Sequence, residues 1–144
     1  MDLKAFYSLY LKANKVVIDN RKLEKGDLFF AFSGENFNAA TLADKAIEEG
    51  ALAVVVEDKQ FENIQKNIIY VPSTLAFLQE LAIYHRQQLK IPIIGLTGSN
   101  GKTILKEWLY QCLSNEFVTV KSPKSFNSQI GLPLSILQID KKHE

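Results

Sequence analysis

The chain has 144 residues, of which 47% are hydrophobic and 23% are charged, and its formal net charge at pH 7 is +1. These values exclude a disordered, collagen-like or disulfide-rich chain, and the near-zero charge argues against a nucleic-acid-binding surface. A single cysteine excludes a cysteine-rich zinc site, and no apolar run reaches the roughly 18 residues of a membrane span. We therefore expect a cytoplasmic protein that binds no nucleic acid and inserts into no membrane.

The first part of the chain alternates between short apolar runs and helical patterns. A helix is predicted from Thr41, with Asp44 completing a weak capping box, and it is predicted to end at Gly50. A second helix is predicted after Ser73, a residue type that commonly caps helices. Strands are predicted where Val, Ile and Phe are enriched, at residues 16–19, 28–32, 51–57 and 68–71.

Lys90-Ile91-Pro92 interrupts this pattern and is the predicted boundary between a domain at residues 1–90 and a second domain at 91–144. Beyond it we predict a strand at 93–97, a Gly-rich loop, a helix at 102–113 and a strand at 117–121. The predicted fold class is therefore α/β: a small N-terminal α/β domain, then the first strand–loop–helix–strand unit of a parallel-sheet domain. Because few residues remain for such a sheet, we expect the second domain to be cut off.

The strongest chemical motif lies between that strand and that helix, and it reads Gly95-Leu96-Thr97-Gly98-Ser99-Asn100-Gly101-Lys102-Thr103. This context is typical of a phosphate-binding loop, whose glycines let backbone N–H groups approach an anion at a helix N-terminus. Lys102 would contact the β- and γ-phosphates of a nucleotide, and the Thr103 hydroxyl would bind Mg²⁺. Leu96 departs from the usual pattern, which has Gly there, and a plain strand-to-helix turn with a surface lysine is the alternative.

The loop variant T-G-S-N-G-K-T, at residues 97–103, resembles that of the Mur ligases and of their relatives, the folylpolyglutamate synthases. Residues 19–21, 26–31 and 34–37 resemble the N-terminal domain of the Mur ligases that add D-alanyl-D-alanine. The segment 125–133 resembles the one that follows the ATP loop in that family. Two further runs, 101–108 and 122–125, are most similar to the form that is fused to an alanine racemase.

This resemblance implies an ATP-dependent ligase of peptidoglycan precursor synthesis. Such enzymes activate the terminal carboxylate of a UDP-N-acetylmuramoyl tripeptide as an acyl phosphate, which the amine of D-alanyl-D-alanine then attacks. The family's N-terminal domain binds the UDP end, and its central domain holds ATP and Mg²⁺. A further Mg²⁺-binding acid, a modified lysine, the adenine pocket and the third domain lie later in the family, so we expect this chain alone to be an inactive monomer.

The resemblance also assigns roles by position. It implies Lys102 and Thr103 as catalytic residues and Thr103 as the Mg²⁺ contact. It implies ATP contacts at Thr97, Gly98, Ser99, Asn100, Gly101, Lys102 and Thr103. It implies substrate contacts at Asp19, Asn20, Arg21, Asn36, Phe37, Asn127 and Ser128.

Three positions depart from the family pattern. Asn20 stands where Ser or Thr is usual, Ala39-Ala40 where Gly-His is common, and Ile104 where a second Thr follows the lysine. Lys102 and Thr103 themselves match the family pattern.

Two other functions stay open from the sequence: another phosphate-loop enzyme, such as a small-molecule kinase or a folylpolyglutamate-type ligase, and a non-catalytic nucleotide-binding module. The N-terminal motifs argue against a kinase, and retention of the loop lysine argues against a vestigial loop. Outside these motifs we expect structural roles. Phe29, Phe30 and Trp108 are predicted core residues, Cys112 is predicted to be buried and inert, and His85 is predicted to pack near a helix end.

Overall fold

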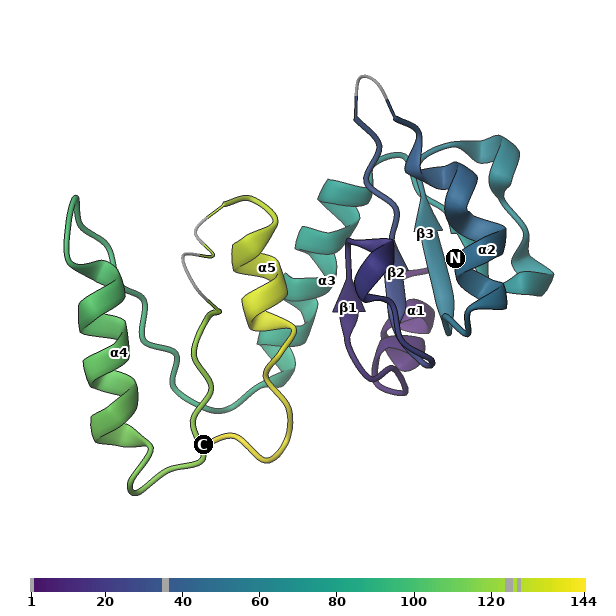
Figure 1. Ribbon diagram of the computed structural model, residues 1–144. Coiled ribbons are helices and arrows are strands. Elements are labelled where there is room, and N and C mark those ends of the chain that lie inside the picture. The colour runs from purple at the N-terminus through teal and green to yellow at the C-terminus, as the bar shows by residue number, and fades with distance from the viewer. Residues whose placement is uncertain (1, 35–36, 124–125, 127) are drawn as a thin grey trace. The chain divides into compact units, whose positions relative to one another are not determined.

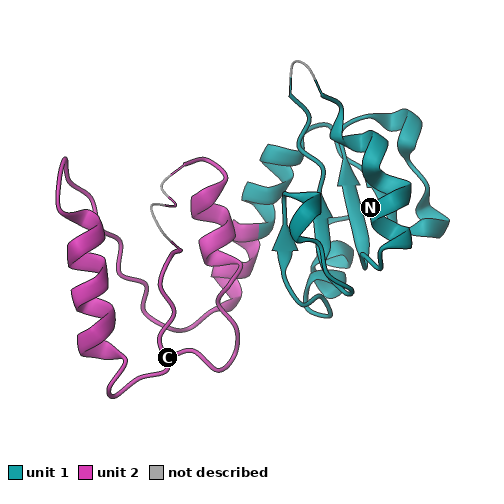
Figure 2. Ribbon diagram, viewed as in Figure 1, with its two compact units in different colours: residues 1–81 teal, residues 82–144 magenta. Residues whose placement is uncertain are grey.

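The computed structural model describes residues 2–34, 37–123, 126 and 128–144 (Figure 1). The chain divides into two compact units, Met1–Leu81 and Ala82–Glu144 (Figure 2). We describe each unit by itself.

A four-stranded parallel sheet with the strand order β1-β2-β3-β4 forms the centre of the first unit. In register, Val16 lies opposite Leu28, Leu28 opposite Ala53, and Val54 opposite Ile68. The strands are β1 (Val16–Val17), β2 (Leu28–Phe30), β3 (Ala53–Val56) and β4 (Ile68–Tyr70). All four predicted strands are confirmed, and each is shorter than predicted because the apolar runs continue past the residues that pair.

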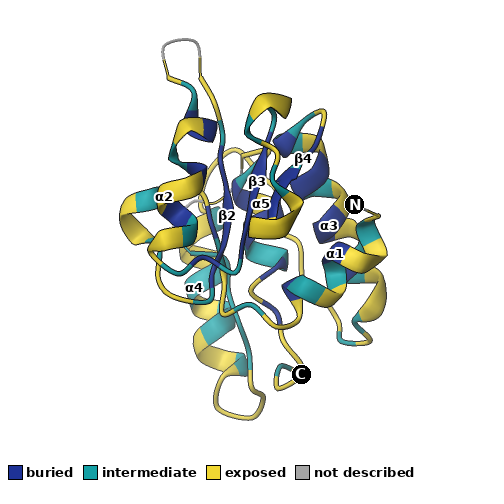
Figure 3. Cartoon of the chain, turned by 90° about the vertical axis from the view of Figure 1, so that its right-hand side faces the viewer, coloured by how far each residue is buried: buried dark blue, intermediate teal, exposed yellow. Residues whose placement is uncertain are grey.

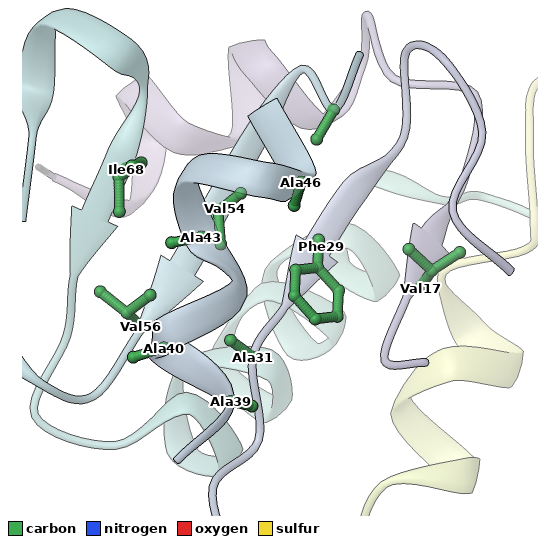
Figure 4. Close-up of a cluster of buried hydrophobic side chains, with 11 residues drawn as sticks. Val17, Phe29, Ala31, Ala39, Ala40, Ala43, Ala46, Val54, Val56 and Ile68 are labelled. Carbon is green, nitrogen blue, oxygen red and sulfur yellow. The ribbon is translucent and has the colours of Figure 1, made fainter. Parts of the chain in front are cut away.

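Helices cover both faces of this sheet (Figure 3). They are α1 (Leu3–Tyr10), which the sequence analysis did not predict, α2 (Ala43–Glu48) and α3 (Thr74–Gln88). On one face, alanines of α2 and the turn before it allow the backbone to approach the strands closely. They pack on Phe29, Val54 and Val56 (Figure 4). On the other face, Phe6 of α1 and Phe77 of α3 pack edge-on at 4.9 Å between ring centroids, and Phe30 lies 6.1 Å from Phe6.

The start of α2 differs from the prediction, whereas its end agrees with it. A 3-10 helix (Ala39–Leu42) precedes α2, and its N-cap is Asn38, whose side chain accepts a hydrogen bond from the Ala40 N–H. Thr41 is not the cap, because its hydroxyl donates to the Asn38 carbonyl at 2.7 Å. Gly50 ends the helix with φ +101°, a left-handed conformation that suits glycine.

The second unit has helices but no strand among its described residues. Its helices are α4 (Lys102–Leu113), at the predicted position, and α5 (Gly131–Ile136), which was not predicted. The segments 93–97 and 117–121, predicted as strands, form no ladder in the described chain. A parallel strand satisfies its backbone groups only through neighbouring strands, and the described residues supply none. α5 was missed because Pro133 resembles a turn residue, yet the first turn of a helix tolerates proline.

Only some of the predicted core residues are buried in the structure. Phe29 and Phe30 are buried as predicted. Trp108 is 64% exposed and Cys112 is exposed, so both predictions of burial were wrong. Their apolar character predicted a core, but they lie on α4, where the described residues provide no sheet to cover them. Within the described ranges, no helix is long and apolar enough to span a membrane.

Candidate functional site

The phosphate-loop motif folds as its glycines predict. Gly98 has φ +148° and Gly101 has φ +79°, and α4 begins at the next residue, Lys102. A β-carbon at position 101 would meet no atom within 4 Å, so backbone conformation rather than space favours glycine there. The first-turn N–H groups of α4 have no acceptor within the helix and are therefore available to an anion.

Lys102 places its charge inside this loop. Its Nζ donates hydrogen bonds to the carbonyl oxygens of Gly98 and, at 3.4 Å, of Ser99. Its side chain is half-buried, whereas the Thr103 side chain beside it is exposed. The loop thus combines an ammonium group and helix N–H groups, which can donate hydrogen bonds to phosphate oxygens, with an exposed hydroxyl, whose oxygen can coordinate a metal ion.

A hollow of about 1180 Å³ opens beside the loop, and every residue that lines it belongs to the second unit. The loop residues 99–103 form part of its wall, with the cationic side chains of Lys106 and Lys121. The rest of the wall is mainly apolar and includes Ile94 and Phe117. The loop therefore lies at the rim of a space large enough for a small-molecule ligand.

A charged network on α4 adjoins the loop, and the sequence analysis did not single it out. Lys121 pairs with Glu107 and lies 4.2 Å from the centre of the Tyr110 ring. Its hydrogen bond lowers the pKa of the Glu107 carboxyl. One helical turn after Lys102, Lys106 donates to the Ser122 carbonyl at 2.9 Å. The i, i+4 spacing of Lys102 and Lys106 could have indicated from the sequence that both lie on the same face of the helix.

In the first unit, Asp19 and Arg21 form a two-point ion pair directly after β1. Arg21 donates from Nε to Oδ1 at 2.9 Å and from Nη2 to Oδ2 at 2.8 Å. These bonds, and a third from the Arg21 backbone N–H, lower the pKa of Asp19 to about 2. The Arg21 side chain is nonetheless 83% exposed. The pair therefore holds a solvent-facing guanidinium in one orientation, with Asn20 between the two residues.

The second predicted loop of this unit follows β2. Gly34 and Phe37 pair with each other through hydrogen bonds of 2.9 and 3.3 Å, and Phe37 is 56% exposed. Because β1 and β2 are parallel neighbours, the two loops emerge at the same edge of the sheet.

The remaining predicted substrate residues lie elsewhere in the chain. Asn36 and Asn127 fall outside the described residues. Ser128 is exposed, and its hydroxyl accepts a hydrogen bond at 2.9 Å from the backbone N–H of Gly131, the first residue of α5. In the described part of the chain, no group of three or more His, Cys, Asp or Glu side chains could hold a metal ion.

Two family models match the chain. The model for the Mur ligase family, catalytic domain, matches residues 12–86, and the model for the Mur ligase middle domain matches residues 96–144. The chain belongs to the Mur ligase family.

Two similar curated proteins carry the same name. The chain is 38% identical over 131 residues to UDP-N-acetylmuramoyl-tripeptide--D-alanyl-D-alanine ligase of Bacillus subtilis, covering 90% of this chain and 28% of that protein. The protein of the same name from Synechocystis is 36% identical over 136 residues, covering 93% and 30%. The chain thus spans about 30% of the length of these relatives.

Solved structures of such ligases, known as MurF, have the same fold. The Thermotoga maritima MurF ligase, solved in complex with ADP, superposes with a TM-score of 0.78 at 34% identity, covering 94% of this chain and 31% of that one. An Acinetobacter baumannii MurF also gives 0.78, at 28% identity, covering 98% and 33%.

Proposed function

We propose that this chain carries the nucleotide loop and the UDP-end binding surface of a ligase that joins D-alanyl-D-alanine to a UDP-N-acetylmuramoyl tripeptide, the reaction for which its relatives are named. The observation that carries the proposal is the placement of Lys102 within a glycine-shaped loop at the rim of the hollow. Membership of the Mur ligase family favours this reaction over the small-molecule kinase that the loop alone left open.

The loop residues fit ATP and Mg²⁺. Bound ATP would supply the phosphoryl group that activates the substrate carboxylate, and Mg²⁺ would neutralise its charge. Lys102 would exchange the carbonyl oxygens of Gly98 and Ser99 for phosphate oxygens, and Thr103 would give its exposed hydroxyl to the metal. The N–H groups from Thr97 to Gly101 would line the phosphates.

We propose that the loops after β1 and β2 bind the UDP end. Asp19 orients Arg21 so that its exposed donors are ready for an anionic or carbonyl oxygen, which reduces the ordering cost of binding. Asn20, Asn36 and Phe37 complete this surface in the proposal, and Asn127 and Ser128 contact the sugar and peptide.

Other parts of the proposal rest on the sequence. They are a domain boundary at residue 90, a cytoplasmic location, a monomeric state and fusion to an alanine racemase. Because the chain spans about 30% of its relatives, binding tests the proposal more directly than turnover does.

The test is an NMR titration of the 144-residue chain, first with UDP-N-acetylmuramoyl tripeptide and UMP and then with Mg-ATP. We expect UDP-ligand shifts at residues 19–21 and 37, and Mg-ATP shifts at 97–103. Lys102→Met should weaken Mg-ATP binding at least tenfold and leave UDP-ligand binding unchanged. Lys90→Met, which removes the same charge outside the motif, is the matched control. Equal effects of the two substitutions would contradict a specific role for Lys102.

A further inference from the structure

Asn38 joins three segments of the first unit through both ends of its side-chain amide. Its Oδ1 accepts hydrogen bonds from the Ser33 hydroxyl at 3.1 Å and from the Ala40 N–H at 3.0 Å. Its Nδ2 donates to Asp58 Oδ2 at 3.0 Å. These partners lie after β2, in the 3-10 helix before α2, and after β3.

The Asp58 carboxylate, which accepts the hydrogen bond from Asn38, is itself held by other hydrogen bonds. Asp58 caps a 3-10 helix (Lys59–Phe61), and its two oxygens accept from the backbone N–H and side-chain amide of Gln60 at 3.2 and 2.6 Å. Partial burial alone would raise the pKa of Asp58, but the hydrogen bonds from Gln60 and Asn38 keep it below the ordinary value. Asp58 is thus an ionised anchor at neutral pH.

The bond to this anchor restrains the backbone next to Phe37. Phe37 precedes Asn38 and is 56% exposed. Because more than half of the residue is uncovered, its own packing restrains it little, and its position depends mainly on the backbone on either side. The Gly34–Phe37 pairing holds one side, and the Asn38 side chain holds the other.

We propose that Asn38 is a positioning residue of the UDP-end site: by bridging Ser33, Ala40 and Asp58 it holds Phe37 in place for the nucleotide end of the ligand. This inference rests on the proposed function, and it assigns to Asn38 and Asp58 a role that the motifs did not reveal.

The chemistry of the bridge provides a sharp test. Asn38 must be a donor toward Asp58 and an acceptor toward Ser33 and Ala40. An amide is both at neutral pH, whereas an ionised carboxylate is an acceptor only. Asn38→Asp keeps the acceptor and the helix cap but places a second carboxylate against Asp58. The two carboxylates repel until one binds a proton. The double variant Asn38→Asp with Asp58→Asn restores one donor and one acceptor in the reverse order.

The experiment measures the affinity of the 144-residue chain for UDP-N-acetylmuramoyl tripeptide between pH 5 and pH 8 by NMR titration. We expect Asn38→Asp to weaken binding about tenfold at pH 7.5 and to recover toward the wild-type value at pH 5. The double variant should bind within threefold of wild type at both pH values. Glu62→Gln, which removes an exposed carboxylate of the same unit that does not contact Asn38, should also bind within threefold and is the control.

The outcomes separate the two proposals. Absence of wild-type binding overturns the proposed function and this inference with it. Wild-type binding that Asn38→Asp leaves unchanged, or weakens equally at every pH without rescue by the double variant, overturns the positioning role alone. If Asn38→Asp does not fold, Asp58→Ala breaks the same bond from the other side; it should weaken binding at least threefold, and unchanged affinity would overturn the role.

Discussion

In the first unit, four paired strands lie between helices and the phenylalanines of the sheet are buried. In the second unit, by contrast, an exposed tryptophan lies on a helix and no described segment pairs as a strand. Phe29 and Phe30 are at most 1% exposed, but Trp108 is 64% exposed. Both regions are rich in apolar residues. The difference teaches that apolar content stabilises a fold only where neighbouring elements can cover it.

The comparison extends to the two candidate binding surfaces. The loops after β1 and β2 project from a paired sheet, which provides a rigid base. The phosphate loop depends on glycine conformations and on Lys102 bonding back to its own carbonyls. The first surface is therefore held by the fold beneath it, and the second by interactions within the loop.

The largest expected effect tests where the stability lies. Phe30→Ala removes a fully buried ring that packs near Phe6 and should reduce the free energy of unfolding by about 3–5 kcal/mol. Trp108→Ala removes a larger ring from the second unit and should change it by less than about 0.5 kcal/mol. Urea denaturation followed by circular dichroism measures both. Equal losses would mean that Trp108 is buried in solution and that the second unit has a core of its own.

The next effect concerns a buried contact within the second unit. His85 is 4% exposed, and its Nε2 lies 2.8 Å from the Ile139 carbonyl oxygen. Burial lowers the pKa of His85 despite that hydrogen bond. The unfolded chain therefore binds the proton more readily, so this contribution to stability is full above about pH 6.5 and is lost as pH falls toward the folded pKa.

Each pH unit by which folding lowers the pKa of His85 corresponds to about 1.4 kcal/mol of unfolding free energy. We expect the thermal midpoint to fall between pH 7 and pH 5, with the His85 ring resonances titrating below pH 6.5. His85→Gln keeps an amide donor for Ile139 and should abolish this part of the pH dependence. If the His85 ring titrates above pH 6.5, its pKa is raised rather than lowered by folding, and the expected pH dependence is wrong.

A smaller effect is expected at the start of α3. Ser73 accepts a hydrogen bond from the Ala76 N–H at 3.2 Å, and Glu57 accepts from the backbone and hydroxyl of Thr74. Because Glu57 already satisfies one N–H, Ser73→Ala should cost only about 0.5–1 kcal/mol of unfolding free energy. Ser73→Asp should restore the wild-type midpoint in the same denaturation measurement, and failure of Asp to do so would argue against capping.

The smallest effect on stability is expected at Arg21. Arg21→Ala removes the partner that lowers the pKa of Asp19 to about 2, and that pKa should return toward the ordinary 3.8. The depressed pKa means that the pair contributes above about pH 4 and is lost toward pH 2. At pH 7 the denaturation midpoint should fall only slightly, since the Arg21 side chain faces solvent. Carboxyl NMR titration of Asp19 measures the shift, and an unchanged pKa would contradict the pairing.

The elements that the sequence predicted well are those with a local cause. Gly50 follows the end of α2 in a left-handed conformation, and Ser73 caps α3. Apolar runs mark the four strands. The wrong predictions depended on distant partners. The runs at 93–97 and 117–121 have the composition of strands, but composition does not reveal whether a neighbour is present to pair with.

At the candidate sites, too, local features could be predicted from the sequence and long-range contacts could not. The conformation of the phosphate loop could be predicted because Gly98, Gly101 and Lys102 act within a few residues of one another. The Asn38–Asp58 bond spans 20 residues and depends on β2 and β3 pairing, so no local pattern contained it. Asn38 could have been recognised as a helix cap, since asparagine before a helical stretch is favoured there, but its bridging role could not.

The strand order β1-β2-β3-β4 advances in one direction without reversal. Open parallel sheets bind ligands in the crevice where the strand order turns back, and the four described strands have no such point. We therefore expect any ligand of the first unit to contact the loops that follow the strands. Such a surface can be changed one loop at a time, so new ligand preferences can be introduced without redesigning the sheet.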